Sequence, residues 1–353
     1  MILSRTPFRV SFFGGGTDYP HWYRQHGGAV VGSTINKYCH ISCRYLPPFF
    51  DHRIRVVYSK IENCQTLDEI QHPAVRECLR YLRISKGVEI HHDGDLPARG
   101  GIGSSSAFTV GLLNALHALK GHIINKRDLA SEGIYIEQDR LRETVGSQDQ
   151  VLTCYGGINH VVFQPNGEID VRPVTLNREA VRELNRHFLL FFTGVQRTAS
   201  DIAASYVGDL SSKKESQMRS ISGMVESCLD ILKRGNYYQF GKLLHESWLL
   251  KQSLGEQISN SRVAELYTAA LSAGALGGKL IGAGGGGYLL VFAHPGEHPK
   301  ILRQLSQCVH VPFRFEFSGS QIVFYDPEEE YVEQEAATDP EDLMVSAISE
   351  KSS

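Results

Sequence analysis

The sequence predicts a mixed α+β protein with two domains and an acidic tail. Its 353 residues, 42% of them hydrophobic and 21% charged, are enough to bury two cores. Apolar runs rich in β-branched and aromatic residues dominate the N-terminal half, whereas the second half carries long stretches with apolar residues at helical spacing. We place the first domain at residues 1–186, the second at 187–326 and the tail at 327–353.

The expected elements follow from these two periodicities. The first domain should contain strands, then two helices and a hairpin that turns at Pro165-Asn166-Gly167, whereas the second should begin with a strand and continue with three helices. In the first domain we expect strands at 10–13, 29–33, 39–45, 53–59 and 88–92, helices at 106–120 and 128–141, and the hairpin at 156–163 and 169–174. In the second we expect a strand at 188–193 and helices at 215–234, 237–254 and 262–273.

A glycine- and serine-rich segment, LPARGGIGSSSA at 96–107, precedes the helix at 106–120. Glycine allows backbone N–H groups to turn toward an anion, and the free N–H groups at the start of a helix attract phosphate. Ser104, Ser105 and Ser106 are N-cap candidates whose hydroxyls could also reach a phosphate-bound Mg²⁺. The segment therefore predicts a phosphate site, with a turn that caps an ordinary core helix as the alternative.

A second glycine-rich segment, KLIGAGGGG at 279–287, also suggests a phosphate loop. Gly282, Gly284 and Gly287 satisfy the dinucleotide pattern G-x-G-x-x-G, but the apolar run at 288–292 predicts a strand where that pattern needs a helix. No segment reads as a Walker A loop. Two glycine-rich segments that could bind phosphate, neither of them a dinucleotide-binding or Walker A loop, suggest a nucleotide ligand.

The N-terminal segment at 5–19 runs from an apolar strand into three glycines and then Asp18. An aspartate in so small a loop suits hydrogen bonds to sugar hydroxyls, with a turn aspartate as the alternative. These three segments, in this order, resemble the three motifs of the GHMP kinase superfamily (galactokinase, homoserine, mevalonate and phosphomevalonate kinases). The serine segment resembles P-x-x-x-G-L-G-S-S, with Ile102 in place of the leucine.

The resemblance covers residues 5 to about 325 and implies a fold, a cofactor and a set of site residues. The implied fold is α+β, with a ribosomal-S5-like N-terminal domain and a ferredoxin-like C-terminal domain around the active site. ATP and Mg²⁺ would be the cofactors. The sugar would meet Gly15, Gly16, Thr17 and Asp18, and the nucleotide would meet Pro97, Gly100, Gly101, Gly103, Ser104, Ser105, Ser106, Gly284, Gly285 and Gly286.

Three further segments narrow the resemblance to one branch of the superfamily. FGGGTDYP at 13–20, GSQDQ at 146–150 and HESWLLKQSL at 245–254 are similar to the bacterial D-glycero-D-manno-heptose-7-phosphate kinases. That branch phosphorylates the anomeric hydroxyl and gives the 1,7-bisphosphate on the route to GDP-heptose. A kinase for another sugar, of the fucose or hexose type, and a non-catalytic relative that senses sugar and nucleotide are the alternatives.

Two carboxylates are candidates for the chemistry. Glu137 lies on or beside the apolar face of the helix expected at 128–141, for which Asp128 is a candidate N-cap. A carboxylate that faces a core needs a cation or hydrogen-bond donors, and Arg140 could be that partner. The resemblance implies instead that Glu137 is a Mg²⁺ ligand together with Ser105.

Asp149 follows Glu137 by twelve residues, an interval that matches the galactokinase-type pair in which the second carboxylate is the base. As general base it would accept the proton of the sugar hydroxyl that attacks the γ-phosphorus. The resemblance places Arg9 near the reacting centre, where it would stabilise the incoming oxygen or the phosphoryl group. A salt bridge from Arg9 to Asp149 is the structural alternative.

The phosphate of a sugar phosphate would need cationic or N–H donors. Arg197, Lys251 and Arg99 are candidates, each with a solvated surface residue as the alternative. Trp248 is expected to fill a helix core rather than to flank the substrate.

Composition and charge fit a cytoplasmic enzyme. Seven cysteines without a C-x-x-C pair predict reduced thiols, and we find no signal peptide, membrane-length apolar run or zinc signature. The net charge of −3 is the sum of two unequal parts. The tail from Asp326 onward carries a charge of −9 and is expected to be mostly disordered. The rest of the chain carries a charge of +6, which suits anionic substrates. We expect a sugar phosphate and ATP as partners, a homodimer as a candidate assembly, and neither nucleic acid nor membrane.

Overall fold

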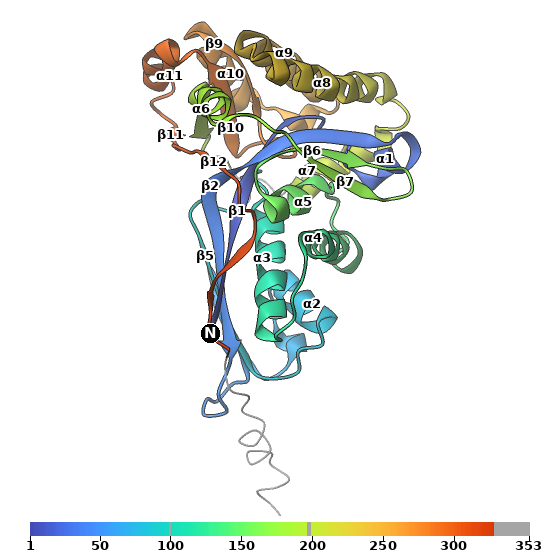
Figure 1. Cartoon of the computed structure of the whole chain (residues 1–353), viewed down its shortest axis with the longest axis vertical. Helices are drawn as coiled ribbons and strands as arrows, with labels where there is room; N and C mark the ends of the chain where they lie inside the picture. The colour runs from blue at the N-terminus through green and yellow to red at the C-terminus, as the bar shows by residue number, and fades with distance from the viewer. Residues whose placement is uncertain (99, 196–198, 328–353) are drawn as a thin grey trace, which may run out of the picture.

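The computed structural model describes residues 1–98, 100–195 and 199–327, and within these ranges the strands form two sheets (Figure 1). The large sheet has the strand order β13-β1-β2-β5-β3-β4, with β12 and β6 also paired to β2, and β7 paired to β6. The small sheet has the order β11-β8-β10-β9. This mixed α+β architecture with two sheets confirms the predicted fold class.

The large sheet is built on two long antiparallel strands, β1 (Ile2–Phe13) and β2 (Gly28–Tyr45), and its remaining strands pair around them. The sequence predicted two short strands within β2, because its centre is polar. The other strands of this sheet are β3 (Ile54–Val57), β4 (Ile61–Cys64), β5 (Val88–Gly94), β6 (Ile158–Phe163), β7 (Ile169–Pro173), β12 (Phe315–Glu316) and β13 (Gln321–Tyr325).

One face of the large sheet is covered by helices, and α3 lies directly against β1 and β2 (Figure 1). Its apolar side chains Leu112, Leu113 and Leu116 are completely buried there. This layer consists of α2 (Pro73–Tyr81), α3 (Ser104–Leu119), α4 (Lys126–Tyr135) with a π-helical turn at Ile136–Arg140, and α5 (Gln148–Tyr155). The short α1 (Pro20–His26) follows β1.

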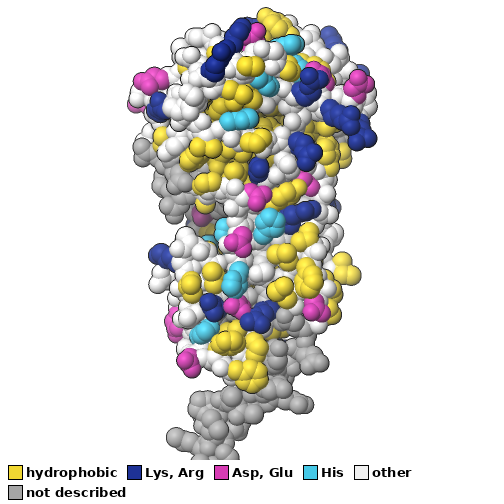
Figure 2. Space-filling view, turned by 90° about the vertical axis from the view of Figure 1, so that its left-hand side faces the viewer, with side chains coloured by type: hydrophobic (Ala, Val, Ile, Leu, Met, Phe, Trp, Pro, Cys, Tyr) yellow, Lys and Arg dark blue, Asp and Glu magenta, His cyan; other side chains and the backbone are white. Residues whose placement is uncertain are grey.

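Figure 2 shows the molecule from the side of the large sheet that lies away from α3, and α8 (Glu215–Arg234) also packs against β1 and β2. Charged and histidine side chains are interspersed with apolar ones along this side of the molecule.

The small sheet contains β8 (Phe188–Phe192), β9 (Ala275–Leu280), β10 (Tyr288–Ala293) and β11 (Val309–His310). The helices of this part of the molecule are α6 (Arg178–Arg186), α7 (Ala199–Ala204), α8 (Glu215–Arg234), α9 (Tyr237–Gln252), α10 (Ser261–Ser272) and α11 (His298–Gln304).

The chain passes to the small sheet at Phe188 but returns to the large sheet at its end, because β12 pairs with β2 and β13 pairs with β1. The last strands of the unit predicted at 187–326 therefore lie in the first sheet. The tail predicted at 327–353 lies, except for its first residue, outside the described residues.

All seven cysteines are free thiols, and six of them are buried. Within the described part of the chain, no helix combines the length and apolar character needed to cross a membrane.

Candidate active site

Arg9 and Asp149 form a bidentate ion pair where β1 meets the start of α5. Arg9 Nε and Nη2 donate to Asp149 Oδ1 and Oδ2 at 2.7 and 2.6 Å. The third arm of the guanidinium, Nη1, donates to the carbonyl of Gly101 in the first glycine-rich segment at 2.5 Å. Arg9 is buried, whereas the side chain of Asp149 stays 24% exposed. The salt bridge considered as the structural alternative is thus present, and it fixes the carboxylate of Asp149 beside the first glycine segment.

Asp18 is held beside this pair by backbone donors. The N–H groups of Gly16 and Gln148 donate to its two carboxylate oxygens at 2.9 and 3.4 Å. The side chain is 1% exposed, and burial, followed by the nearby charge of Asp149, raises its pKa. Space for it depends on Gly146, where a Cβ atom would lie 1.8 Å from Asp18 Oδ2.

The glycines before Asp18 make a tight turn whose geometry Thr17 secures. Gly14 has φ +82°, and a Cβ there would lie 2.0 Å from the carbonyl oxygen of Ala29. The hydroxyl of Thr17 donates to the carbonyls of Gly14 and Ala29, both at 2.8 Å. The hydroxyl of Thr17 is engaged by the backbone and holds the loop, and the predicted contact of Thr17 with the sugar stays a prediction. Gly15 is half-buried, and Gly16 supplies the N–H that orients Asp18.

Glu137 is completely buried among neutral donors. Ser106 Oγ and Gln150 Nε2 both donate to its Oε2, at 2.9 and 2.5 Å. Its Oε1 makes no hydrogen bond of ordinary length within the described residues, although the hydroxyl of Thr109 lies close enough to favour the ionised carboxylate and lower its pKa. Burial, followed by the charge of Glu143, raises the pKa of Glu137 to about 8.

Two local predictions about this region are wrong. The helix that leads to Glu137 is capped by Asn125, whose side chain accepts from the backbone N–H of Asp128, so Asp128 lies in the first turn and is not the cap. Arg140 does not reach Glu137, because the π-helical turn directs its guanidinium to Glu77, 2.8 Å away. No cation among the described residues forms a salt bridge with Glu137.

The Glu137 carboxylate fits a magnesium ion. A hard cation prefers oxygen ligands, and a buried carboxylate with a raised pKa and one unpartnered oxygen lacks the positive charge that would stabilise its ionised form. Ser105 was predicted as the serine ligand, but it is exposed in the first turn of α3, and Ser106 is the serine that contacts Glu137. The contact with Glu137 makes Ser106 a second candidate, and the assignment of Ser105 stays a prediction.

The first glycine segment opens α3 as predicted, but with a different cap. Gly103, at φ +71°, occupies the N-cap position, and Ser104, Ser105 and Ser106 form the first helical turn. A Cβ at Gly103 would lie 3.0 Å from Arg9 Cγ, so this glycine lets the helix start reach the ion pair. The N-terminus of α3 thus opens beside Arg9 and Asp149. Pro97 is exposed at the entry to the segment, and Gly100 is buried.

The second glycine segment packs against the first. A Cβ at Gly101 would lie 2.3 Å from the carbonyl oxygen of Ile281, and one at Gly282 would lie 2.5 Å from Gly101 Cα. The N–H of Tyr288 donates to the carbonyl of Gly100 at 3.1 Å. Two glycine segments distant in sequence are thereby held backbone to backbone.

The second glycine segment was predicted to meet the nucleotide through Gly284, Gly285 and Gly286. The structure shows another reason for glycine at these positions, which is close packing. Gly284 faces the backbone of Ile258, and Gly286 faces that of Val195, each leaving no room for a Cβ. The N–H of Gly285 already donates to the carbonyl of Ile258 at 2.9 Å. This N–H is therefore engaged by the protein, and close packing accounts for much of the glycine content.

Two buried lysines approach the site from the opposite side. Lys251, on α9, was predicted either to bind a substrate phosphate or to be a surface residue, and its 9% exposure excludes the second alternative. Its ammonium donates to the carbonyl of Gly282. Lys279, on β9, is 3% exposed and donates to the carbonyl of Phe12 at 3.0 Å. Neither Lys279 nor Gln150 was predicted as a site residue, although a lysine inside an otherwise apolar strand next to a glycine loop was an available signal.

Three candidate residues for the substrate site remain, and two of them are not among the residues that the structure describes. Arg99 and Arg197 lie outside the described residues. Trp248 is completely buried, in accordance with the expected core role.

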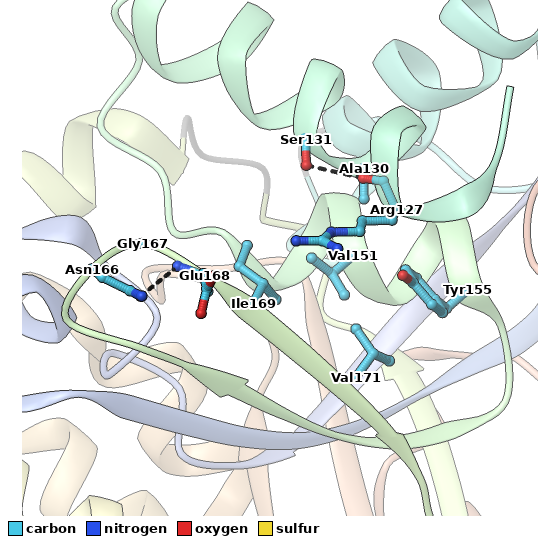
Figure 3. A pocket seen from close by; sticks show the side chains of 10 residues that line it. All are labelled: Arg127, Ala130, Ser131, Val151, Tyr155, Asn166, Gly167, Glu168, Ile169 and Val171. Atoms are coloured by element: carbon cyan, nitrogen blue, oxygen red, sulfur yellow. Dashed lines mark hydrogen bonds between the residues drawn. The ribbon is translucent and has the colours of Figure 1, made fainter.

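An open pocket of about 280 Å³ lies away from these residues, between α4, α5 and the β6–β7 hairpin (Figure 3). Arg127 extends across it, and Glu168 and Ile169 line its hairpin side. None of the predicted site residues lines this pocket.

Comparisons with known proteins identify one family of kinases. The family models for the GHMP kinases N terminal domain and the GHMP kinases C terminal match residues 70–157 and 228–310. The chain is 27% identical over 317 residues to D-glycero-alpha-D-manno-heptose 7-phosphate kinase of Campylobacter jejuni, covering 86% of this chain and 93% of that protein. It is also 27% identical over 346 residues to L-fucokinase/L-fucose-1-P guanylyltransferase of Bacteroides fragilis, covering 86% of this chain but 36% of that protein.

Solved structures share the fold at lower identity. A D-glycero-D-manno-heptose 1-phosphate kinase of Bacteroides thetaiotaomicron superimposes with a TM-score of 0.76 at 22% identity, covering 92% of this chain and 100% of that one. Lactococcus lactis galactokinase, complexed with galactose, superimposes with a TM-score of 0.72 at 17% identity, covering 91% and 94%.

Proposed function

Since the chain belongs to the GHMP kinase family, we propose that it is an ATP-dependent sugar kinase acting on an anomeric hydroxyl. The substrate that we propose is D-glycero-D-manno-heptose 7-phosphate, converted to the 1,7-bisphosphate on the route to GDP-heptose in the cytoplasm. The observation that carries the proposal is the Arg9–Asp149 pair, held at 2.6–2.7 Å beside the first glycine segment.

Asp149 is the proposed general base. The sugar hydroxyl oxygen attacks the γ-phosphorus, its proton passes to Asp149, and the bond from phosphorus to the oxygen of ADP breaks with its electron pair on ADP. Asp149 can receive the proton because its side chain is 24% exposed. Arg9 fixes the orientation of the carboxylate through two hydrogen bonds, and its positive charge stabilises the negative charge of the transferring group.

Glu137 and Ser106 are the proposed holders of magnesium. The ion, when bound with ATP, neutralises charge on the phosphate oxygens. Gln150 orients Glu137 through the hydrogen bond to Oε2, which leaves Oε1 available as a ligand. The N-terminus of α3, capped by Gly103, offers N–H donors and its dipole to the nucleotide phosphates.

Asp18 is the proposed sugar ligand. Its carboxylate lies beside Asp149, and a hydroxyl bound between the two would be presented to the base. The curated relatives support a sugar as acceptor, because one is named for heptose 7-phosphate and the other for L-fucose. Fucose lacks the phosphate of the heptose, so the second relative supports an anomeric kinase of the fucose type as the rival candidate.

The first experiment is an ADP-release assay with Mg-ATP across heptose 7-phosphate, hexose 6-phosphates, fucose and mannose, followed by phosphorus NMR of the product. Turnover with heptose 7-phosphate and a new anomeric phosphate signal is the expected result. Turnover only with a neutral sugar would support the proposed kinase activity but contradict heptose 7-phosphate as the substrate. ATP binding without turnover of any sugar would favour a sensor, a role that does not require the arranged base.

A further inference from the structure

Lys251 and Lys279 come from the part of the chain that builds the small sheet, yet their ammonium groups end at the site built on the large sheet. Lys251 lies on α9 and Lys279 on β9, and both side chains are buried. α9 and β9 are packed closely, since a Cβ at Gly277 would lie 2.1 Å from the carbonyl oxygen of Gly241. One packed unit therefore delivers two cations to the same region.

Each ammonium is connected to Arg9 by a short path of contacts. Lys251 donates to the carbonyl of Gly282, whose backbone touches that of Gly101, and Gly101 in turn accepts the hydrogen bond from Arg9 Nη1. Lys279 donates to the carbonyl of Phe12, three residues after Arg9 on β1. The two lysines thus reach the ion pair by different routes, one through the glycine segments and the other through β1.

The charges around the reacting centre do not balance. When all are ionised, Arg9, Lys251 and Lys279 supply three positive charges, whereas Asp18 and Asp149 supply two negative ones. Arg9 and Asp18 act electrostatically on both lysines, and Asp149 acts on Lys251. Arg9 already occupies both oxygens of Asp149. The hydrogen bonds described for the two ammonium groups go to backbone carbonyls.

A surplus of buried positive charge is costly unless an anion compensates it. Burial and the neighbouring cations accordingly lower the pKa of Lys251 to about 8 and that of Lys279 well below its ordinary value. Phosphoryl transfer brings such an anion, because the group in transit carries negative charge on its equatorial oxygens. Cations in place before the reaction stabilise this charge without reorganisation.

Resting on the proposed kinase activity, we propose that Lys251 is a further catalytic cation that contacts the phosphoryl group in transit, and that Lys279 is a positioning residue for the sugar loop. In the transfer, the acceptor oxygen bonds to phosphorus, the bond to ADP breaks with its electron pair on ADP, and the proton goes to Asp149. Lys251 stabilises the group between the two oxygens. Lys279 fixes the carbonyl of Phe12 and, through it, the turn that carries Asp18.

The test compares Lys251→Met and Lys251→Arg with the exposed control Lys213→Met. For Lys251→Met we expect kcat to fall about 100-fold, with the KM for Mg-ATP within about threefold of the parent, as for loss of one preorganised transition-state donor. Its melting temperature should equal or exceed that of the parent, because methionine removes a buried charge at similar volume. Lys251→Arg should recover part of kcat, and Lys213→Met should leave both quantities unchanged.

Lys279→Met tests the positioning role. It should raise the KM for the sugar more than the KM for Mg-ATP and lower kcat about tenfold, since Asp18 loses its fixed position. Lys279→Arg keeps the charge and should restore part of the sugar KM. Equal changes in the two KM values would contradict this role.

A binding measurement separates this inference from the proposed substrate. Calorimetry with MgADP and aluminium fluoride, which mimics the transferring group, requires no identified sugar. We expect Lys251→Met to bind this mixture at least about tenfold more weakly than the parent, while it binds MgADP alone equally well. Weaker binding by Lys251→Met would support the role of Lys251 even if none of the tested sugars is a substrate. Equal binding, or a lowered melting temperature with kcat within twofold of the parent, would show that Lys251 is structural.

Discussion

Asp149 and Glu137 lie twelve residues apart in the sequence, but their surroundings are opposite. Asp149 remains 24% exposed and receives two hydrogen bonds from a guanidinium. Glu137 is completely buried, receives its hydrogen bonds from a hydroxyl and an amide, and has a pKa raised to about 8.

The difference matches the two roles that we propose for these carboxylates, a general base at Asp149 and a metal ligand at Glu137. A carboxylate that is paired with a fixed cation and open to solvent can exchange a proton with a substrate. A carboxylate that is closed off among neutral donors keeps one oxygen for a cation that arrives with the nucleotide. Environment, rather than residue type, separates the base from the metal ligand.

Asp149→Asn should have the largest effect, because it removes the base and keeps the shape. We expect kcat to fall by about 1,000-fold or more while the Kd for Mg-ATP changes little, measured by ADP release and calorimetry. Asp139→Asn, on the exposed side of the π-helical turn, is the matched control. Retained turnover in Asp149→Asn would disprove the base assignment.

Glu137→Gln should come next. Glutamine keeps the volume and loses the charge, so we expect Mn²⁺ to bind at least about tenfold more weakly, measured by electron paramagnetic resonance with ATP present, and kcat to fall about 100-fold. Glu265→Gln, on the exposed face of α10, should change neither quantity. Unchanged Mn²⁺ binding would remove Glu137 from the metal site.

Ser106→Ala should weaken the same site less, because Gln150 still holds Glu137. An increase of about tenfold in the Mg²⁺ concentration needed for half-maximal activity is expected. Ser105→Ala, one residue away and exposed, should leave this concentration unchanged. A larger effect from Ser105→Ala would restore the original assignment of the serine ligand.

The smallest effect is on stability in the absence of metal. Because the folded-state pKa of Glu137 is raised to about 8 from an ordinary 4.5, its contribution is fully present below pH 4.5 and is lost as the pH rises through 8. The parent should therefore lose a few degrees of melting temperature relative to Glu137→Gln between pH 5 and pH 9. Parallel melting curves across this range would show that Glu137 is not the group responsible.

The sequence predicted the elements with strong periodicity and the residues within recognisable motifs. The predicted helix at 215–234 coincides with α8, and Arg9, Asp18 and Asp149 come together as the resemblance implied. The identity of the contacting serine could not be predicted, because it depends on whether α3 begins at Ser104 or at Ser106.

Contacts between distant segments were also beyond the sequence. Glycine content suggested phosphate binding in both glycine segments, yet Gly284 and Gly286 face backbone, a requirement that only the folded chain reveals. Lys279 lies in a strand and has no local partner in the sequence, and its role depends on the carbonyl of Phe12, which is 267 residues away in the chain. Residues whose partners are distant in sequence leave no local pattern.

The backbone contact between the two glycine segments has a mechanical consequence. Gly100 accepts a hydrogen bond from the first residue of β10, and Gly101 lies against Gly282 at the end of β9. The loop before α3 is therefore also a joint between the two sheets. Moving the two sheets apart would therefore break the hydrogen bond at Gly100 and deform the loop that opens α3.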